Sequence, residues 1–235
     1  MQSTATWPHH IERYSRCPKK TYYSWNITPQ MSPDAEIIKR VICRAYTYQS
    51  KKNIVPTFKF MPYWQGIEYG RIIKDNPDYR HSKNILERLY SWYHTYYLKS
   101  RDIGMANIPI NTSYNGQEYA DVIDVLEIGH GVRIYDFTEL TKDKDSTPAI
   151  IYNDIKVLAR CWGFELACGI TPIEYTKWTI GPRSMKPLTI KVDEKFMEKA
   201  RRIIPHILTG MAKEVWYPSV SEQCNSCPHL EYCSL

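Results

Sequence analysis

The stretch YADVIDVLEIGHGVRIYDFTE, residues 119–139, decides the fold of this 235-residue chain. Its first half is rich in Val, Ile and Leu and predicts a strand over 119–128. A Gly-His-Gly turn then leads into a second predicted strand over 132–137. A further strand over 108–114 precedes both and ends at Asn115-Gly116, a dipeptide favoured in two-residue hairpin turns. The three segments therefore predict an antiparallel β-meander.

Helical patterns surround the meander. A helix is expected to begin at Ser32-Pro33-Asp34, and apolar residues at helical spacing predict further helices over 82–100, 148–168 and 193–210. A fourth strand is predicted over 173–180. Prolines should limit helices over residues 1–30, and residues 53–80 hold several Pro and Gly residues, which predicts irregular structure or a short strand. This order of elements predicts a mixed α/β fold in one domain spanning 1–235.

The composition is that of a globular protein, with 43% hydrophobic and 24% charged residues, which excludes a disordered or fibrous chain. No apolar run approaches the roughly 18 residues of a membrane span, so no membrane association is expected. The first ten residues lack the basic and apolar pattern of a signal peptide. We therefore expect an intracellular, cytoplasmic protein.

Positive charge is concentrated in one window. The chain carries a net charge of +6, and residues 37–67 contain no Asp or Glu. The basic residues of this window are Lys39, Arg40, Arg44, Lys51, Lys52 and Lys59. Such a patch attracts polyanions, which makes Lys39, Arg40, Arg44, Lys51 and Lys52 candidate DNA-binding residues. A solvated helix face would have the same pattern.

The cysteine pattern predicts a metal site. Seven cysteines, an odd number, argue against a secreted disulfide framework. Cys224, Cys227 and Cys233 have a spacing that lets three thiolates converge, and thiolates favour zinc or iron–sulfur clusters. The fourth ligand could be His229, which would complete a zinc site, or Cys17, which would join the two ends of the chain.

Two carboxylates in the meander are candidate metal ligands. Asp124 interrupts an apolar strand, and Asp136 ends the neighbouring strand. A carboxylate in such surroundings needs a partner. A divalent cation between the two would remove their mutual repulsion, and bound Mg²⁺ can activate water and stabilise a phosphodiester's developing charge. Ion pairing of Asp124 with an Arg is the alternative, and the commoner one.

Four motifs in order resemble one nuclease family. They are Tyr14-Ser-Arg-Cys17-Pro, Asp121-Val-Ile-Asp124, Asp136-Phe-Thr138 and the cysteine triplet at 224–233. The chain resembles the RecB-like branch of the PD-(D/E)XK nucleases, and in particular its iron–sulfur members, the AddB C-terminal nuclease domain and the CRISPR-associated RecB-like exonucleases.

The resemblance implies a restriction-endonuclease-like core at about 105–181, with flanking helices. It also implies a [4Fe–4S] cluster on Cys17, Cys224, Cys227 and Cys233 that joins the termini. By the same resemblance Asp124 and Asp136 would bind Mg²⁺ or Mn²⁺ for cutting DNA. The leading expectation for this chain is an exonuclease that acts on single strands or ends.

The sequence departs from the family pattern at several positions. Thr138 stands where the family has its catalytic Lys, and Asp121 where it has a Gly. The metal-binding His of the early helix has no counterpart, since His81 and His94 do not fit. The family's Gln-x-x-x-Tyr motif has Lys156 and Arg160 as its nearest positions.

These departures leave three functions open. In the first, the chain is a metal-dependent DNA nuclease in which Lys142, Lys144 or Lys156 replaces the missing Lys. Lys156 joins Asp124 and Asp136 as the predicted catalytic set. In the second, the chain no longer cuts and serves as a structural or DNA-binding subunit of a replication, recombination or viral assembly, and it could itself be virus-encoded. In the third, zinc bound with His229 makes it an interaction module.

Overall fold

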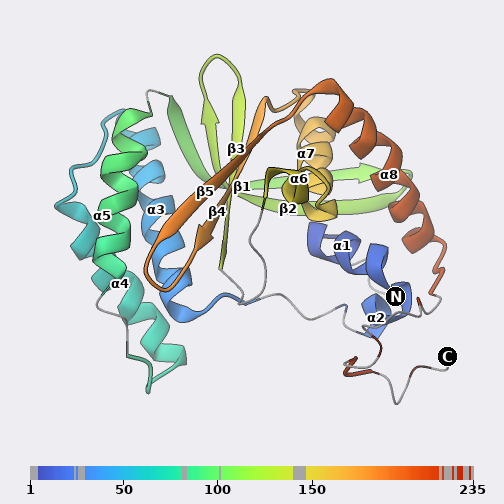
Figure 1. Cartoon of the computed structure of the whole chain (residues 1–235), viewed down its shortest axis with the longest axis horizontal. Coiled ribbons are helices and arrows are strands. Elements are labelled where there is room, and N and C mark those ends of the chain that lie inside the picture. The colour runs from blue at the N-terminus through green and yellow to red at the C-terminus, as the bar shows by residue number, and fades with distance from the viewer. Residues whose placement is uncertain are drawn as a thin grey trace.

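A mixed five-stranded sheet forms the centre of the molecule (Figure 1). The computed structural model describes residues 5–23, 25, 30–80, 84–100, 102–139, 147–216, 219, 224, 227–229 and 233. The sheet order is β1-β2-β3-β4-β5, in which only the β3–β4 pair is parallel. The strands are β1 (Ile103–Tyr114), β2 (Gln117–Ile128), β3 (Val132–Glu139), β4 (Glu174–Ile180) and β5 (Met185–Lys191).

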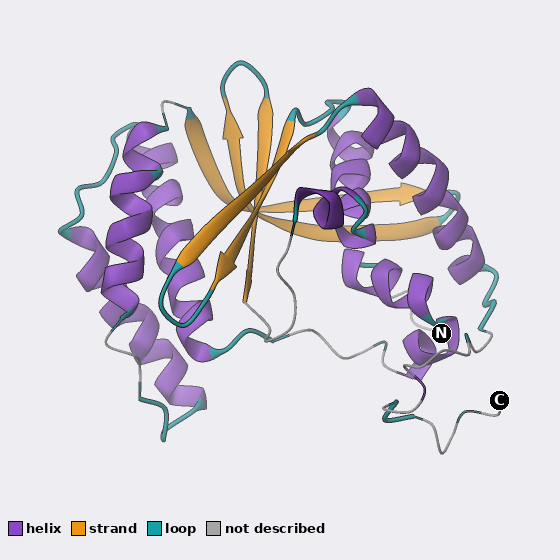
Figure 2. Cartoon of the chain, in the orientation of Figure 1, coloured by secondary structure: helices purple, strands orange, loops and turns teal. Residues whose placement is uncertain are grey.

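Helices cover both faces of this sheet (Figure 2). On one face lie α3 (Pro33–Lys52), α4 (Phe60–Asp75) and α5 (Ile85–Thr95), followed by the short 3-10 helix η1 (Tyr97–Lys99). On the other lie α1 (Pro8–Arg16), α2 (Pro18–Tyr23), α6 (Pro148–Tyr152), α7 (Ile155–Cys168) and α8 (Glu194–Ala212). Each face has its own apolar core. None of the helices within the described ranges is both long and apolar enough to cross a bilayer.

The predicted meander is confirmed. Asn115 and Gly116 join β1 to β2 with φ angles of 49° and 80°, the left-handed pair that a two-residue hairpin turn requires. The strand predicted over 173–180 is β4. Strand β5 was missed, because Pro187 lies within it. Proline is tolerated there because β5 is an edge strand.

The prediction of irregular structure over 53–80 is wrong, because α4 lies in this range. Pro62 falls in the first helical turn, where a missing N–H costs nothing, and Gly66 and Gly70 face open space. Met61 and Trp64 point inward at helical spacing. At the N-terminus, Pro8 and Pro18 likewise begin α1 and α2 rather than interrupt them.

The single helix predicted over 148–168 is in fact two. α6 ends at Tyr152, and the Asp154 side chain caps α7 by accepting a hydrogen bond from the Lys156 N–H. A similar break shortens the helix predicted over 82–100, since α5 ends at Thr95 and η1 follows. The helices predicted to begin at Ser32 and Asp193 are confirmed, with both side chains capping.

The sheet forks near its middle. β2 pairs with β3 only from Val125 to Ile128. Beyond that point β2 continues as a ribbon with β1, with a single bridge from Thr6 to Tyr119 on its other side, while β3 continues beside β4. Asp124 and Asp136 are the first residues past the last β2–β3 pair, so the fork separates the two strands where the two carboxylates lie.

The N-terminal helices pack against the segment that follows α8. The Tyr14 hydroxyl donates a hydrogen bond of 2.7 Å to the carbonyl of Val215. The Trp216 ring lies 5.5 Å from that of Tyr14 and 5.7 Å from that of Tyr22. Residues about two hundred positions apart are thus in direct contact.

Candidate functional site

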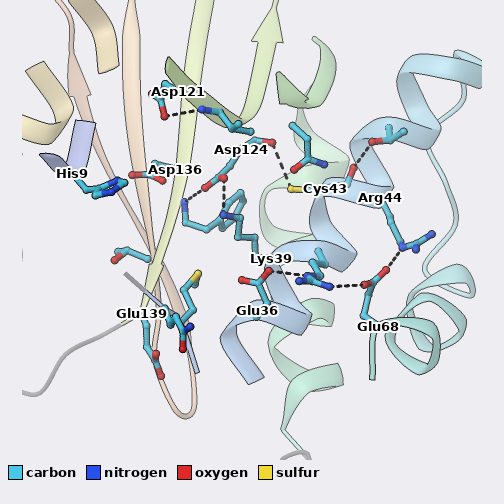
Figure 3. A pocket seen from close by; sticks show the side chains of 18 of the residues that line it. His9, Glu36, Lys39, Cys43, Arg44, Glu68, Asp121, Asp124, Asp136 and Glu139 are labelled. Atoms are coloured by element: carbon cyan, nitrogen blue, oxygen red, sulfur yellow. Dashed lines mark hydrogen bonds and ion pairs between the residues drawn. The ribbon is translucent and has the colours of Figure 1, made fainter. Parts of the chain in front are cut away.

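A groove of about 1690 Å³ opens at the fork of the sheet. Its lining comes from α1, α3, α4 and α7, from the middle of β2 and from the end of β3 (Figure 3). Asp124, Asp136 and Lys156 line it. So do the five basic residues singled out from the sequence, Lys39, Arg40, Arg44, Lys51 and Lys52. Two predictions made from separate parts of the sequence therefore meet in one cavity.

An irregularity in β1 and β2 determines where Asp124 points. The paired residues pass from Ala106–Val125 to Ile108–Ile123, and Asn107 between them has a left-handed φ of 55°. Side chains normally alternate along a strand. Here Ile123 belongs to the core under α7 and Val125 to the core under α3, so the alternation shifts at Asp124. Backbone irregularities of this kind re-aim side chains near functional sites.

Asp124 is buried and paired with a lysine. Its Oδ1 lies 2.7 Å from Lys39 Nζ, and its Oδ2 accepts a hydrogen bond of 2.9 Å from the Phe137 N–H. Burial, and then the negative charge of Asp136, raise the pKa of Asp124 to about 6. Lys39 lowers it, but only in part. The partner is thus a lysine of α3, not the arginine considered from the sequence.

Asp136 is surrounded by donors. Arg160 Nη1 lies 2.6 Å from its Oδ1. Lys156 Nζ lies 3.5 Å from its Oδ2, which also accepts a hydrogen bond of 2.8 Å from the Tyr175 hydroxyl. Burial opposes ionisation, but Arg160 and then Lys156 outweigh it and hold the pKa of Asp136 well below its usual range. Asp136 is therefore a carboxylate at neutral pH.

Asp121 and Arg160 form a buried pair that the sequence reasoning missed. Arg160 donates two hydrogen bonds to Asp121, of 2.7 Å from Nε and 2.9 Å from Nη2. In the sequence both residues stand out only as departures from the family pattern. Their contact shows that the two residues form one buried ion pair. The signal was present, since a buried-strand Asp and a helix Arg on an apolar face each require a partner.

Three of the cations along α3, Lys39, Arg40 and Arg44, have acidic partners. Arg40 Nε donates to Glu36 at 2.7 Å, and Arg44 Nε donates to Glu68. Lys51 and Lys52 are exposed at the C-terminal end of the helix. Among the described residues that line the groove, eight are Lys or Arg and seven are Asp or Glu. The groove is therefore nearly balanced in charge, and its exposed cations include Lys51 and Lys52 at the end of α3 and Arg71 of α4.

His9 is a second residue of the groove that was not foreseen. Figure 3 shows its ring directed toward Asp136. Burial, and then the proximity of His10, lower the pKa of His9 to about 3, so the imidazole is neutral at physiological pH. Thr138 also lines the groove. Of the other positions considered, His94 lies on α5, while His81, Lys142 and Lys144 lie outside the described residues.

The four predicted cluster ligands are all half-buried cysteines, and none of the four is in a disulfide. Cys17 follows α1, and its sulfur accepts a weak hydrogen bond of 3.5 Å from the Lys20 N–H. The Cys227 N–H donates to the Cys224 carbonyl at 3.1 Å, which closes a tight turn. Within the described ranges no three His, Cys, Asp or Glu side chains converge closely enough to hold a metal ion. The cluster and the catalytic metal both remain predictions.

No protein-family model matches the chain, and no curated protein sequence matches it. Among solved structures, the chain is similar to a putative exonuclease from Eubacterium rectale. That match has a TM-score of 0.51 and 13% identity, and it covers 96% of this chain and 87% of the other. A second match, named SSO0001, has a TM-score of only 0.39 at 11% identity over 96% and 95% of the two chains. The similarity to the first structure indicates a nuclease-like fold.

Proposed function

We propose that this chain is a DNA-binding, metal-dependent nuclease that acts on single strands or DNA ends. The observation that carries the proposal is the position of Lys156. Its ammonium lies 3.5 Å from Asp136, in the same groove as Asp124 and the basic face of α3. The family pattern has a lysine beside its second metal-binding carboxylate, which corresponds to Asp136 here. In this chain the lysine comes from α7 instead of β3.

The donor set of the acidic centre suits a hard divalent cation. Asp124 and Asp136 offer carboxylate oxygens, and Mg²⁺ usually keeps several waters and takes one or two carboxylates. Burial, and then the negative charge of Asp136, raise the pKa of Asp124, and Lys39 offsets this only in part. When bound, Mg²⁺ or Mn²⁺ would activate water and stabilise charge on the phosphodiester.

The side chains around the centre would then share the remaining tasks. Lys156 would orient the attacking water or stabilise the charged phosphate, a field that the shorter, uncharged Thr138 cannot supply. His9 lines the same groove, where its lowered pKa keeps the imidazole uncharged.

The test is cleavage of labelled single-stranded DNA in the presence of Mn²⁺. Lys156→Ala should reduce the rate by about 10²–10³, as expected when one aligned donor is lost. Asp136→Asn should abolish cleavage, and Lys186→Ala on the exposed edge of β5 should leave it unchanged. Brisk cleavage by the Lys156→Ala variant would remove Lys156 from the proposed machinery.

A second candidate, a subunit that binds DNA without cutting it, is favoured by a different observation. Lys39 and Arg160 already contact the two carboxylates directly, at 2.7 Å and 2.6 Å. With Lys156, the site has three cationic side chains. With Asp121, which pairs with Arg160, it has three carboxylates, so the charges balance without a metal ion. Absence of cleavage by both the natural protein and Thr138→Lys, with DNA binding retained, would select this role in a larger replication, recombination or viral assembly.

We further propose a [4Fe–4S] cluster on Cys17, Cys224, Cys227 and Cys233, with zinc as the alternative occupant. The support is the contact between Tyr14 and Val215, which brings the chain near Cys17 to the segment that leads to the triplet. Protein purified without air should contain about four irons per chain. Cys17→Ser should lose them, whereas Cys168→Ser, an exposed cysteine on α7, should keep them. One zinc and no iron would contradict the cluster.

A further inference from the structure

The groove extends well past the acidic centre along one face of α3. Arg40, Arg44, Tyr48 and Lys51 recur every three or four residues, so they lie on the same side of the helix, and all four line the groove. Lys39 contacts Asp124 near the start of the helix. At 1.5 Å per residue, Tyr48 lies about 14 Å further along the helix axis. This distal part of the groove has no role in the chemistry proposed above.

Glu68 of α4 organises the arginines in this distal part. Its side chain is only 1% exposed and contacts the guanidinium groups of three arginines. It accepts hydrogen bonds from Arg44 Nε and, at 3.2 Å, from Arg71 Nη1, and it lies 3.7 Å from Arg40 Nη1. The Arg44 and Arg71 side chains remain 31% and 57% exposed. One buried carboxylate thus holds two partly exposed guanidinium groups beside the groove, with donors left for a further anion.

Tyr48 lies one helical turn beyond Arg44 and is supported by other rings. Its ring centroid is 5.5 Å from that of Phe60 and 5.9 Å from that of Trp64. Trp64 is 8% exposed and packs in the core, whereas Tyr48 is half-buried. A ring fixed in this way loses little freedom when another flat group packs on it.

Guanidinium groups that can donate hydrogen bonds to a phosphate lie next to a supported aromatic ring. This arrangement matches the two parts of a nucleotide, its phosphate and its base. We propose that Arg44, Arg71 and Tyr48 form a nucleotide subsite, in which the two guanidinium groups bind a phosphate and the Tyr48 ring stacks on the adjoining unpaired base. The inference rests on the proposed binding of DNA in this groove. Duplex DNA would not fill the subsite, because its bases are stacked on each other and offer no free face.

Binding of two single strands of equal length tests the subsite, one oligothymidylate and one abasic strand with the same phosphates. Tyr48→Ala should weaken binding of oligothymidylate by about 5- to 150-fold and leave the abasic strand unaffected, since stacking needs a base. Arg44→Gln should weaken both and reduce the salt slope by about 0.7 for each phosphate that is no longer bound.

Two control variants change the same types of residue, a tyrosine and an arginine, at exposed positions that do not line the groove. Tyr63→Ala removes a more exposed tyrosine of α4, and Arg202→Gln an exposed arginine of α8, so neither should change binding of either strand. Equal affinity of Tyr48→Ala and the natural protein for oligothymidylate, or an equal loss on both strands, would overturn the subsite alone. No binding of either strand by the natural protein would instead overturn the proposed function, and the subsite with it.

Discussion

Arg160 holds two carboxylates at once, and this makes it the most constrained charge of the site. It pairs with Asp121 through two hydrogen bonds and with Asp136 at 2.6 Å, and all three side chains are nearly fully buried. A buried charge without a partner is very unfavourable, whereas a balanced set is tolerated. The identity of residue 160 is therefore tied to that of residue 121.

Replacement of Arg160 alone should show this dependence. Arg160→Gln leaves Asp121 buried and unpaired, which should lower the free energy of unfolding by about 3–5 kcal/mol. The double variant Asp121→Asn/Arg160→Gln should recover part of that loss, which denaturant unfolding of the four proteins would measure as coupling. Strictly additive losses would contradict the pairing. Arg201→Gln, in an exposed pair with Glu165, should cost less than about 1 kcal/mol.

His10 should make stability depend on pH. Burial lowers the pKa of His10 to about 4, although its ring contacts the Trp25 carbonyl at 2.9 Å. Because the folded-state pKa lies below the unfolded value near 6.5, the unfolded chain binds more protons between these values. Stability should therefore fall as the pH falls from about 6.5 toward 4, by at most about 3 kcal/mol from this group. His10→Gln should flatten that part of the profile in denaturant titrations, and an unchanged slope would contradict the assignment.

At the scale of elements, the backbone conformation of Asn107 in β1 marks the position of the fork of the sheet. Its left-handed φ of 55° coincides with the shift of alternation in β1 and β2. The apolar pattern of residues 119–128 could predict the strand but not this shift, because Val, Ile and Leu occur on both of its faces. Because β2 and β3 are neighbouring strands of a hairpin, the sequence could predict that Asp124 and Asp136 lie close together. It could not predict where these two strands separate.

Substitutions at Asn107 test the need for this conformation. Asn107→Gly should be nearly neutral, since Gly adopts positive φ without cost. Asn107→Val should lower the free energy of unfolding by about 1–2 kcal/mol, because a β-branched residue is strained there. The matched control is Asn111→Val, at an exposed extended position of the same strand, where Val is favoured. Similar stabilities for the two Val variants would contradict the role of Asn107.

The basic residues between positions 37 and 67 show why the net charge of the groove could not be predicted from the sequence. Residues 37–67 hold no acid, but Glu36 and Glu68 lie immediately outside the window on either side. Both fold back onto its arginines. The position of the basic face could be predicted from helical spacing, but the counterion from α4 could not, because the sequence over 53–80 did not predict a helix.

At the scale of the whole molecule, contact between the two ends of the chain should contribute measurably to stability. Tyr14→Phe removes only the hydroxyl that donates to Val215, so it should lower the free energy of unfolding by about 0.5–1.5 kcal/mol. Tyr90→Phe, an exposed tyrosine of α5, is the matched control and should have no effect in thermal or denaturant unfolding. Equal stabilities for the Tyr14 and Tyr90 variants would show that the end-to-end contact is not formed in solution.

The contact between Tyr14 and Val215 also has a consequence for the order in which the protein is made. Helix α1 leaves the ribosome before its partner, which lies 201 residues later in the chain. Contacts between residues this far apart in sequence are slow to form, because a large loop must close first. α1 also supplies the groove wall that contains His9. The wall of the groove that α1 supplies therefore gains its last contacts only after α8 and the segment that follows it have been made.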